Sequence, residues 1–262
     1  MLVKAKKSLG QNFLIDKNII TKIVSISDIT NKDVLEIGPG TGNLTEYIIK
    51  KKPKKLFLIE KDEALYQELQ LKFQNEVEII NQDILKIDEK KISDNKLIVF
   101  GNLPYNISTE IICSWIIKLE KNFWFTELIL MFQKEVADRI VSKINTSNYG
   151  RLSILLNWRM NIQKVFDISP NCFSPRPKVD SSLLHFTPKE DYLKIQKSKN
   201  LEMITRIFFN QRRKMIKNPL KQLFKNYSEI SKKLDLDLRL RPQNLSLETY
   251  CNIVREYEKL TS

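Results

Sequence analysis

The hydrophobic residues in the first half of the chain follow two alternating patterns. Short apolar runs with the length and composition of buried strands are residues 33–37, 56–59, 77–80, 96–100 and 128–132. Segments between them with apolar side chains every three or four positions, as in amphipathic helices, are residues 16–27, 43–50, 62–73 and 107–119. Asp16 is expected to cap the first of these helices. The alternation predicts an α/β fold with a mostly parallel sheet.

The pattern loosens after Phe132. Two more helices are expected at residues 133–142 and 150–159, and two late strands at residues 165–168 and 182–186. A proline-rich loop separates these two strands. The late strands extend the α/β part of the chain.

Strand signals end near Pro188, and the residues from about Tyr192 onward have helical patterns rich in Lys, Leu and Asn. We therefore place a domain boundary near Lys189. The expected organisation is an α/β domain over residues 1–189 and a small all-α domain over residues 190–262.

A glycine-rich loop follows the expected strand at residues 33–37. Its sequence, GPGTG at residues 38–42, lacks the G-x-G-x-x-G spacing of dinucleotide-binding loops. The G-x-G-x-G form is typical of methyltransferase-like sheets, in which glycines such as Gly38 and Gly40 let the backbone approach a nucleoside without a pyrophosphate. An ordinary glycine-rich turn is the alternative interpretation of this loop alone.

Acidic residues close the next two expected strands. Glu60 comes directly after residues 56–59, where a carboxylate can accept hydrogen bonds from both hydroxyls of a ribose. Asp83 follows residues 77–80 and can accept from an adenine amino group. Each could instead be a solvated charge at a strand end. Together with the glycine loop, they predict a nucleoside site at the carboxyl edge of the sheet.

The sequence GNLPY at residues 101–105 follows a strand and points to chemistry on an exocyclic adenine amine. That amine is a poor nucleophile because its lone pair is delocalised into the ring, so it must be held and aimed. The side-chain oxygen of Asn102 can accept one N–H, and a backbone carbonyl near Leu103 or Pro104 can accept the other. Pro104 stiffens the turn, and Tyr105 offers an aromatic face for the extruded base. An Asn/Pro turn with a packed tyrosine is the alternative.

The charge of the chain favours a polyanionic partner. Its 262 residues include 44 Lys or Arg and 31 Asp or Glu, which gives a formal net charge of +13. Such a surplus attracts RNA in particular. A general abundance of lysine would also explain the charge.

Cysteine and histidine usage narrows the class further. Three widely separated cysteines, without a C-x-x-C pair, argue against disulfides and zinc and favour a reducing, cytoplasmic environment. The single histidine, His185, is expected to be a strand residue rather than a metal ligand, and we expect no metal. Because the sequence has neither an apolar signal core nor a run long enough to span a bilayer, we expect no membrane association.

Together the motifs resemble those of the KsgA/RsmA-type ribosomal RNA adenine dimethyltransferases, relatives of the erythromycin-resistance methyltransferases. The resemblance covers nearly the whole chain. It is carried by KSLGQNFL at residues 7–14, GPGTG at 38–42, GNLPYNIST at 101–109, QKEV at 133–136, YGRLS at 149–153, FSPRPKVDS at 173–181 and FNQRRK at 209–214. The family usually has Gly where this chain has Asn210, a difference that touches RNA docking and is expected to have little effect.

The resemblance implies a Rossmann-like, S-adenosylmethionine-dependent methyltransferase domain over residues 1–189 and an RNA-binding helical domain over residues 190–262. Expected cofactor contacts are Asn12, Leu14, Gly38, Gly40, Glu60, Asp83 and Asn102. Expected catalytic residues are Asn102, Leu103, Pro104 and Tyr105. Expected substrate contacts are Tyr105, Phe173, Arg206, Arg212, Arg213 and Lys214.

The basic residues of the second domain are expected to share one helix. Arg206, Arg212, Arg213, Lys214 and Lys217 would then place several phosphate-binding side chains on one face. A solvated helix face is the alternative interpretation of such a charge run.

Three hypotheses for the function follow. The first is dimethylation of two adjacent adenines near the 3′ end of small-subunit (16S) ribosomal RNA, by a monomer acting on a pre-30S particle in ribosome biogenesis. The second is a large-subunit RNA methyltransferase of the erythromycin-resistance type, and the third is a non-catalytic RNA-binding assembly factor. The forms of residues 102–109 and 149–153 favour the first, whereas intact Glu60, Asp83 and Asn102 argue against the third.

Overall fold

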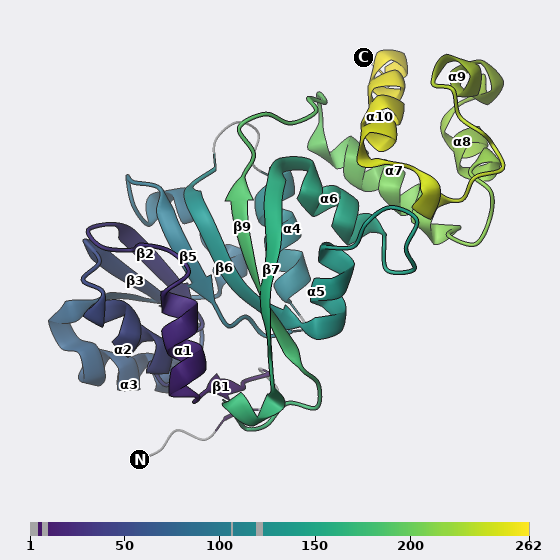
Figure 1. Ribbon diagram of the computed structural model, residues 1–262. Helices are drawn as coiled ribbons and strands as arrows, with labels where there is room; N and C mark the ends of the chain where they lie inside the picture. Colours follow the sequence, from purple (N-terminus) through teal and green to yellow (C-terminus); the bar gives the residue numbers. More distant parts are fainter. Residues whose placement is uncertain (1–4, 7–9, 106, 119–122, 262) are drawn as a thin grey trace. The chain divides into compact units, whose positions relative to one another are not determined.

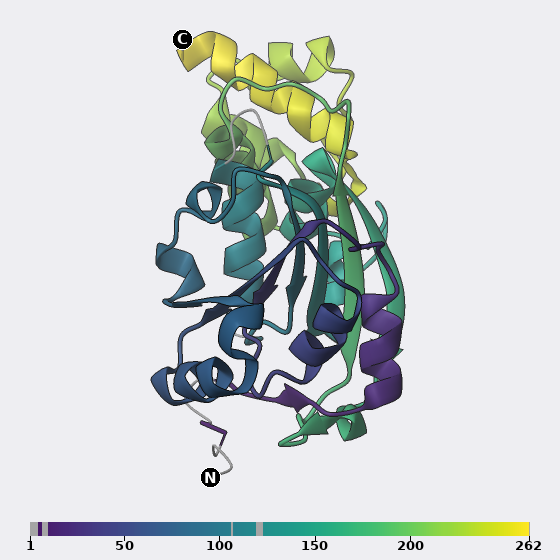
Figure 2. The same cartoon turned by 90° about the vertical axis from the view of Figure 1, so that its left-hand side faces the viewer.

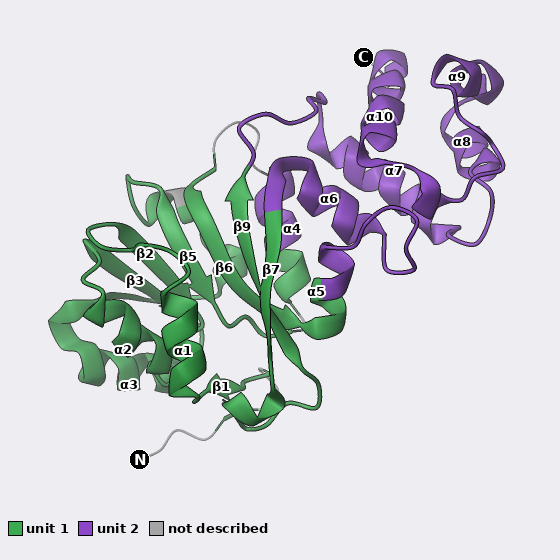
Figure 3. Cartoon of the chain, viewed as in Figure 1, with its two compact units in different colours: residues 1–111, 122–137, 162–188 green, residues 112–121, 138–161, 189–262 purple. Residues whose placement is uncertain are grey.

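The computed structural model describes residues 5–6, 10–105, 107–118 and 123–261. The chain divides into two compact units, each formed by segments from several parts of the sequence (Figure 3). Unit 1 comprises residues 1–111, 122–137 and 162–188, and unit 2 comprises residues 112–121, 138–161 and 189–262. The longest segment of unit 2 thus begins at Lys189, but unit 2 also includes two earlier segments. A division into two functional domains at this residue stays a prediction.

Within the described residues, unit 1 is built on a seven-stranded sheet in the order β4-β3-β2-β5-β6-β9-β7 (Figure 1). Its strands are β2 (Asp33–Ile37), β3 (Lys55–Glu60), β4 (Glu78–Asn81), β5 (Leu97–Gly101), β6 (Phe125–Gln133), β7 (Met160–Ile168) and β9 (Ser181–Pro188). The strands from β4 to β6 are parallel, and β9 pairs antiparallel with β6. The prediction of an α/β fold with a mostly parallel sheet is confirmed.

Helices alternate with these strands along the chain, as the apolar periodicity predicted. They are α1 (Lys17–Val24), α2 (Asn43–Lys50), α3 (Glu63–Phe73), α4 (Ser108–Lys118) and α5 (Lys134–Ile140). α1 and α2 lie side by side (Figure 2). Their apolar side chains share one core with strand residues such as Val34 and Ile98. Asp16 caps α1 as predicted, because its carboxylate accepts from the backbone N–H groups of Asn18 and Ile19 at 2.9 and 3.0 Å.

A short pair of strands was not predicted. β1 (Phe13–Leu14) pairs antiparallel with β8 (Phe173–Ser174), and Leu14 lies opposite Phe173. Strands of two residues carry no periodic signal, and the partners are far apart in sequence. β7 also begins earlier than the predicted strand at residues 165–168. The prediction missed its first half because only the first and last side chains of β7 are buried, which leaves a weak apolar pattern.

Unit 2 has a helical core of its own. Its main helices are α6 (Arg151–Arg159), α7 (Ser198–Asn210), α8 (Lys217–Leu223), α9 (Tyr227–Lys233) and α10 (Leu247–Thr261). Leu201 and Phe208 of α7 pack in this core with Tyr250 and Ile253 of α10. The predicted helices after Tyr192 are therefore confirmed.

The expectation of one continuous basic helix is wrong. α7 ends at Asn210, and Arg212, Arg213 and Lys214 lie in the turn that leads to α8. The chain leaves the helix here because Ile216, the next buried residue, donates its N–H to the carbonyl of Leu240 at 2.8 Å instead of continuing the helical ladder. The basic residues therefore do not have the helical spacing that their sequence suggested.

Candidate active site

The glycine loop connects β2 to α2 through a left-handed backbone. Gly38, Gly40 and Gly42 have φ angles of +66°, +58° and +76°, which glycine adopts without the strain that a Cβ would cause. A Cβ on Gly40 would also lie 2.6 Å from Cδ1 of Phe13. The loop therefore needs glycine at position 40 for its conformation and for space.

Glu60 ends β3, directly beside β2, and its side chain faces the glycine loop. The residue is 6% exposed. Its Oε2 accepts from the N–H of Gly40 at 3.3 Å, and its Oε1 accepts from the N–H of Asp62 at 2.8 Å. Burial raises the pKa of this carboxyl, and the backbone hydrogen bonds oppose the rise. An ionised carboxylate has about four acceptor positions, so Glu60 retains capacity for hydroxyl donors of a ligand.

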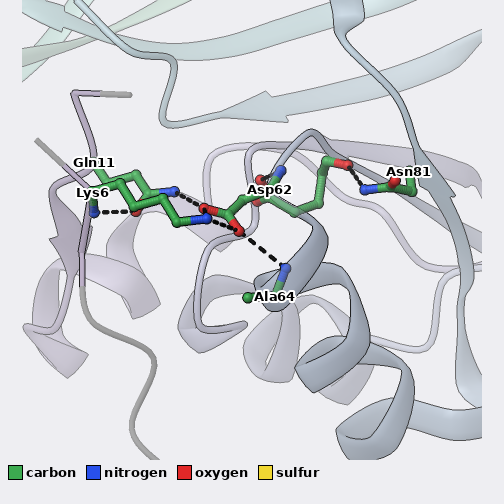
Figure 4. Close-up of polar contacts among 6 residues, drawn as sticks. Lys6, Gln11, Asp62, Ala64 and Asn81 are labelled. Carbon is green, nitrogen blue, oxygen red and sulfur yellow. Dashed lines mark hydrogen bonds and ion pairs between the residues drawn. The ribbon is translucent and has the colours of Figure 1, made fainter. Parts of the chain in front are cut away.

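Asp62 ties the N-terminal segment to this edge of the sheet (Figure 4). Lys6 Nζ lies 2.9 and 2.8 Å from its two carboxylate oxygens, and Gln11 Nε2 donates to Oδ2 at 3.1 Å. The same carboxylate caps α3 by accepting from the N–H of Ala64 at 3.0 Å. Although burial opposes it, the bonds from Lys6 and Gln11 hold the pKa of Asp62 below its usual range. Asp62 therefore fixes Gln11 and the residues after it beside the glycine loop.

Asn102 follows β5 and is oriented by the N-terminal segment. Its Nδ2 donates to the backbone carbonyl of Asn12 at 2.8 Å. This hydrogen bond assigns the two ends of the carboxamide, because a carbonyl can only accept. The side-chain oxygen of Asn102 is therefore the end directed away from Asn12, as an acceptor. Asn12 thus contributes through its backbone, a role that its side-chain type could not have revealed.

The rest of the GNLPY turn is held by α4 and β9. The carbonyl of Pro104 accepts from the N–H groups of Ile107 and Ser108, both at 3.1 Å. Because these two amides occupy the oxygen of Pro104, the carbonyl of Leu103 becomes the better candidate for accepting from a ligand. Tyr105 Oη lies 2.5 Å from Oγ of Ser181, the first residue of β9.

Asp83 lies just after β4. Its carboxylate accepts from Lys61 Nζ at 2.7 Å and from the N–H of Leu85 at 3.1 Å. The hydrogen bond from Lys61 holds the pKa of Asp83 below its usual range, against a smaller effect of burial. Asp83 is therefore a charged acceptor that already has a cationic neighbour.

A cavity of about 1040 Å³, its open mouth included, joins these groups. The predicted site residues on its wall are Asn12, Gly38, Gly40, Glu60, Asp83, Asn102, Leu103, Pro104 and Tyr105. Wall residues that sequence reasoning missed include Gln11, Phe13, Lys61 and Gln82. The cavity lies where β2 separates β3 from β5, the kind of switch point at which open α/β sheets bind ligands.

Two of the residues predicted to contact the cofactor or the target base are not on this wall. Leu14 is 5% exposed in β1, and its carbonyl accepts from Asn43 Nδ2 at 2.8 Å. Phe173 is 3% exposed in β8, opposite Leu14. Both side chains belong to the core under α1 and α2, and their predicted contacts with cofactor or base stay predictions.

The predicted RNA contacts belong to unit 2. Arg206 is an exposed residue of α7, and Arg213 and Lys214 are exposed in the turn that follows. Arg212 donates from its guanidinium to the backbone carbonyl of Ser147. Part of its donor capacity is therefore used within unit 2, whereas Arg213 and Lys214 present their charges to solvent.

His185 is a strand residue as predicted. It lies in β9, where its Nε2 is 2.8 Å from Oε2 of Glu127. Among the described residues, no group of three His, Cys, Asp or Glu is placed to hold a metal ion. In the same part of the chain, the three cysteines are free thiols, and no helix has the length and apolar character needed to cross a membrane.

Comparison with known proteins identifies the family. The profile of the family described as ribosomal RNA adenine dimethylase matches residues 2–259. A protein of Pelagibacter ubique (strain HTCC1062), named ribosomal RNA small subunit methyltransferase A, is 64% identical over 99% of both chains. A protein of the same name from Ehrlichia ruminantium (strain Gardel) is 42% identical over 96% of this chain and 97% of its own.

Solved structures agree with this match. A dimethyladenosine transferase from Plasmodium falciparum superposes with a TM-score of 0.81 at 27% identity, covering 94% of this chain and 98% of its own. The 23S rRNA methyltransferase ErmE superposes with a TM-score of 0.69, over 96% of this chain and 100% of its own, but at 21% identity it supports the fold alone.

The site and the comparisons together define a Rossmann-like methyltransferase with a helical C-terminal part. The chain belongs to the ribosomal RNA adenine dimethylase family. It is an enzyme that methylates adenine in ribosomal RNA, as the resemblance of its motifs predicted.

Proposed function

We propose that this enzyme transfers methyl groups from S-adenosylmethionine to N6 of two adjacent adenines near the 3′ end of 16S ribosomal RNA, two groups to each. The substrate is the small-subunit RNA in a pre-30S particle, and the enzyme acts as a cytoplasmic monomer. The observation that carries the chemistry is the hydrogen bond from Asn102 Nδ2 to Asn12, which leaves the carboxamide oxygen as an acceptor at the cavity. The relatives named for the small subunit support the choice of RNA.

The cavity fits S-adenosylmethionine. The left-handed glycines leave room for a ligand against the backbone of Gly38 and Gly40. The buried Glu60 suits the ribose hydroxyls, and Asp83 suits the adenine amino group. When bound, this cofactor supplies an electrophilic methyl group. Apolar wall residues such as Ile37 and Ile59 exclude water around it.

The GNLPY turn prepares the attacking amine. The oxygen of Asn102 accepts one N–H of the target N6, and the carbonyl of Leu103 accepts the other. These two bonds turn the nitrogen lone pair away from the ring and orient it for attack. No strong base is required, because the amine becomes acidic once it is alkylated. After the first transfer one N–H remains, so the same acceptors can hold the amine for the second.

RNA binding is assigned to the exposed basic residues of unit 2. Arg206, Arg213 and Lys214 can contact phosphates, which give affinity and register without reading sequence. Base selection then falls to the cavity, where Tyr105 offers its ring to the extruded adenine. No feature of the described residues favours large-subunit RNA, and the complete set of cavity residues speaks against a non-catalytic role.

The direct experiment maps methylated adenines in ribosomal RNA from cells with and without this gene. Mass spectrometry of the digested RNA should show dimethyladenosine at two adjacent 16S positions only when the gene is present. Monomethyladenosine alone, or methylation confined to large-subunit RNA, would contradict the proposal.

A variant pair tests the role of Asn102. Asn102→Ala should lose most turnover at saturating substrates, because the acceptor acts on the reacting nitrogen. Asn95→Ala is the matched control: Asn95 precedes β5, and its Nδ2 donates to Asp33 at 3.0 Å. Near-normal turnover of Asn102→Ala would refute the mechanism, and loss of cofactor binding instead would make Asn102 a cofactor ligand.

A further inference from the structure

The motif FSPRPKVDS ends at a serine that the proposed methyl transfer does not use. Ser181 is fully buried, with 0% of its surface exposed. Its hydroxyl oxygen lies 2.5 Å from the hydroxyl oxygen of Tyr105. The contact therefore connects a sheet strand to the turn that receives the target base.

Ser181 stands on a well-supported part of the sheet. It is the first residue of β9 and lies opposite Gln133 in the ladder with β6. Directly before it, the carbonyl of Asp180 accepts from the N–H of Lys134 at 2.9 Å. Because the backbone is paired at Ser181 and at the residue before it, the Ser181 hydroxyl is held in a fixed position for its partner.

The ring of Tyr105 needs a fixed hydrogen-bond partner of this kind. It lies in the turn between β5 and α4, is half-buried, and lines the cavity. An aromatic side chain on a turn can swing about its first side-chain torsion unless its far end is held. The phenol keeps its proton at neutral pH, since burial raises its pKa above an already high ordinary value, and its hydroxyl can share a hydrogen with Ser181. The hydrogen bond holds the far end of the ring and so fixes the direction in which the side chain points.

We propose that Ser181 is a positioning residue for methyl transfer, which holds the ring of Tyr105 in the orientation that stacks the extruded adenine. The inference rests on the proposed function, because it takes adenine as the base on the ring. Ser181 itself does not contact RNA, and its whole effect passes through the Tyr105 hydroxyl. Without the hydrogen bond between Ser181 and Tyr105, fewer of the docked substrates present their amine to Asn102, whereas docking through phosphates is retained.

A double-mutant cycle tests this route. Ser181→Ala, Tyr105→Phe and the double variant are assayed with small subunits that lack the modification, at saturating S-adenosylmethionine. Each single change should lower kcat by about threefold to tenfold, the range expected for one hydrogen bond, with little change in KM for the subunits. The double variant should be no slower than either single variant, because each change removes the same interaction.

The neighbouring serine is the matched control. Ser182 is equally buried in β9, and its hydroxyl donates to Asp167 Oδ1 at 2.6 Å. Ser182→Ala should keep the kcat of the wild type, and calorimetry should give every variant the wild-type affinity for S-adenosylmethionine. Ser181→Thr, which retains the hydroxyl, should restore turnover if Ser181→Ala proves poorly folded.

Three results would overturn the role of Ser181. They are an unchanged kcat in Ser181→Ala, an equal loss in Ser182→Ala, or an added loss from Ser181→Ala in the Tyr105→Phe background. These results count against Ser181 alone when the wild type methylates the subunits. A wild-type protein that methylates no adenine in them would overturn the proposed function, and the stacking role with it.

Discussion

Replacing Glu60 by glutamine should weaken S-adenosylmethionine binding. Because Gln is nearly isosteric with Glu, the main change is the loss of the negative charge. The carboxylate already accepts from Gly40 and Asp62, and its remaining acceptor positions are those proposed for the two ribose hydroxyls. The variant keeps one acceptor oxygen, but its amide nitrogen meets a backbone donor. It therefore disturbs both the ligand contact and one internal hydrogen bond.

The size of the effect follows from the burial of Glu60. A hydrogen bond to a charged group contributes about 1.5–3 kcal/mol, and one to a neutral group about 0.5–1.5 kcal/mol. The difference between them is about 1–1.5 kcal/mol for each bond, so the two proposed bonds to the ribose hydroxyls together lose roughly 2–3 kcal/mol. Because about 1.4 kcal/mol corresponds to a factor of ten, the Kd should rise about thirtyfold to a hundredfold. At 6% exposure, solvent screening does little to reduce this loss.

Isothermal titration calorimetry at constant ionic strength is the assay. Glu36→Gln is the control, because Glu36 is also buried in the sheet, at 2% exposure, but accepts from Thr45 Oγ1 at 2.6 Å. Its Kd should stay at the wild-type value. In the wild type, affinity should also fall on acidification at a higher pH than for an ordinary carboxyl, because burial raises the pKa of Glu60. An unchanged Kd in folded Glu60→Gln would refute the reasoning.

Three further predictions concern the loop, the sheet and unit 2. Gly40→Ala should cost about 1–2 kcal/mol of stability, because residue 40 has a left-handed φ of +58°. It should also weaken cofactor binding, because its Cβ displaces Phe13. Chemical denaturation and calorimetry measure the two effects, and an unchanged stability together with an unchanged cofactor Kd would contradict the packing. Burial raises the pKa of Glu36 from 4.5 to about 8, so the folded state holds this proton more tightly than the unfolded chain. The free energy of unfolding should therefore fall as pH rises from about 4.5 to about 8. In Glu36→Gln, denaturation should show a smaller dependence of this free energy on pH. The same pH dependence in both proteins would show that Glu36 is not its source. Arg212→Ala combined with Arg213→Ala should weaken binding to undermethylated small subunits, and the salt dependence of that binding should become less steep by about one unit for each phosphate that the variant no longer neutralises. The control is Arg239→Ala combined with Arg241→Ala, an exposed pair in the same unit, which should change the slope less. Equal slopes for the two double variants would remove the turn after α7 from the RNA-binding surface.

Much of the fold and of the cavity could be predicted because polar and glycine residues of the site directly follow the apolar runs that form the strands. Gly38, Glu60, Asp83 and Asn102 each come at or just after the end of a parallel strand, and parallel strands bring such ends to one edge. The alternation of strand and helix sufficed to place them together. The order of the strands and the antiparallel β9 required the pairings themselves.

The N-terminal contacts could not be predicted from local patterns. Lys6 and Gln11 meet Asp62 across more than fifty residues, 56 and 51 respectively, and the sequence around Asp62 indicates only a helix cap. The carbonyl of Asn12 and the packing of Phe13 on Gly40 are likewise fixed by tertiary structure. The end of α7 was missed because helix propensity does not register a backbone bond such as that between Ile216 and Leu240.

The attachment of Lys6 to Asp62 also matters for how this protein is purified. An affinity tag fused to the first residue introduces extra charge and bulk close in sequence to the ammonium group that holds this carboxylate. Competition at Asp62 would loosen Gln11 and, through Asn12, the carboxamide of Asn102. Protein carrying a tag after α10, or with the N-terminal tag removed, is therefore the preparation on which cofactor affinities and turnover numbers should be measured.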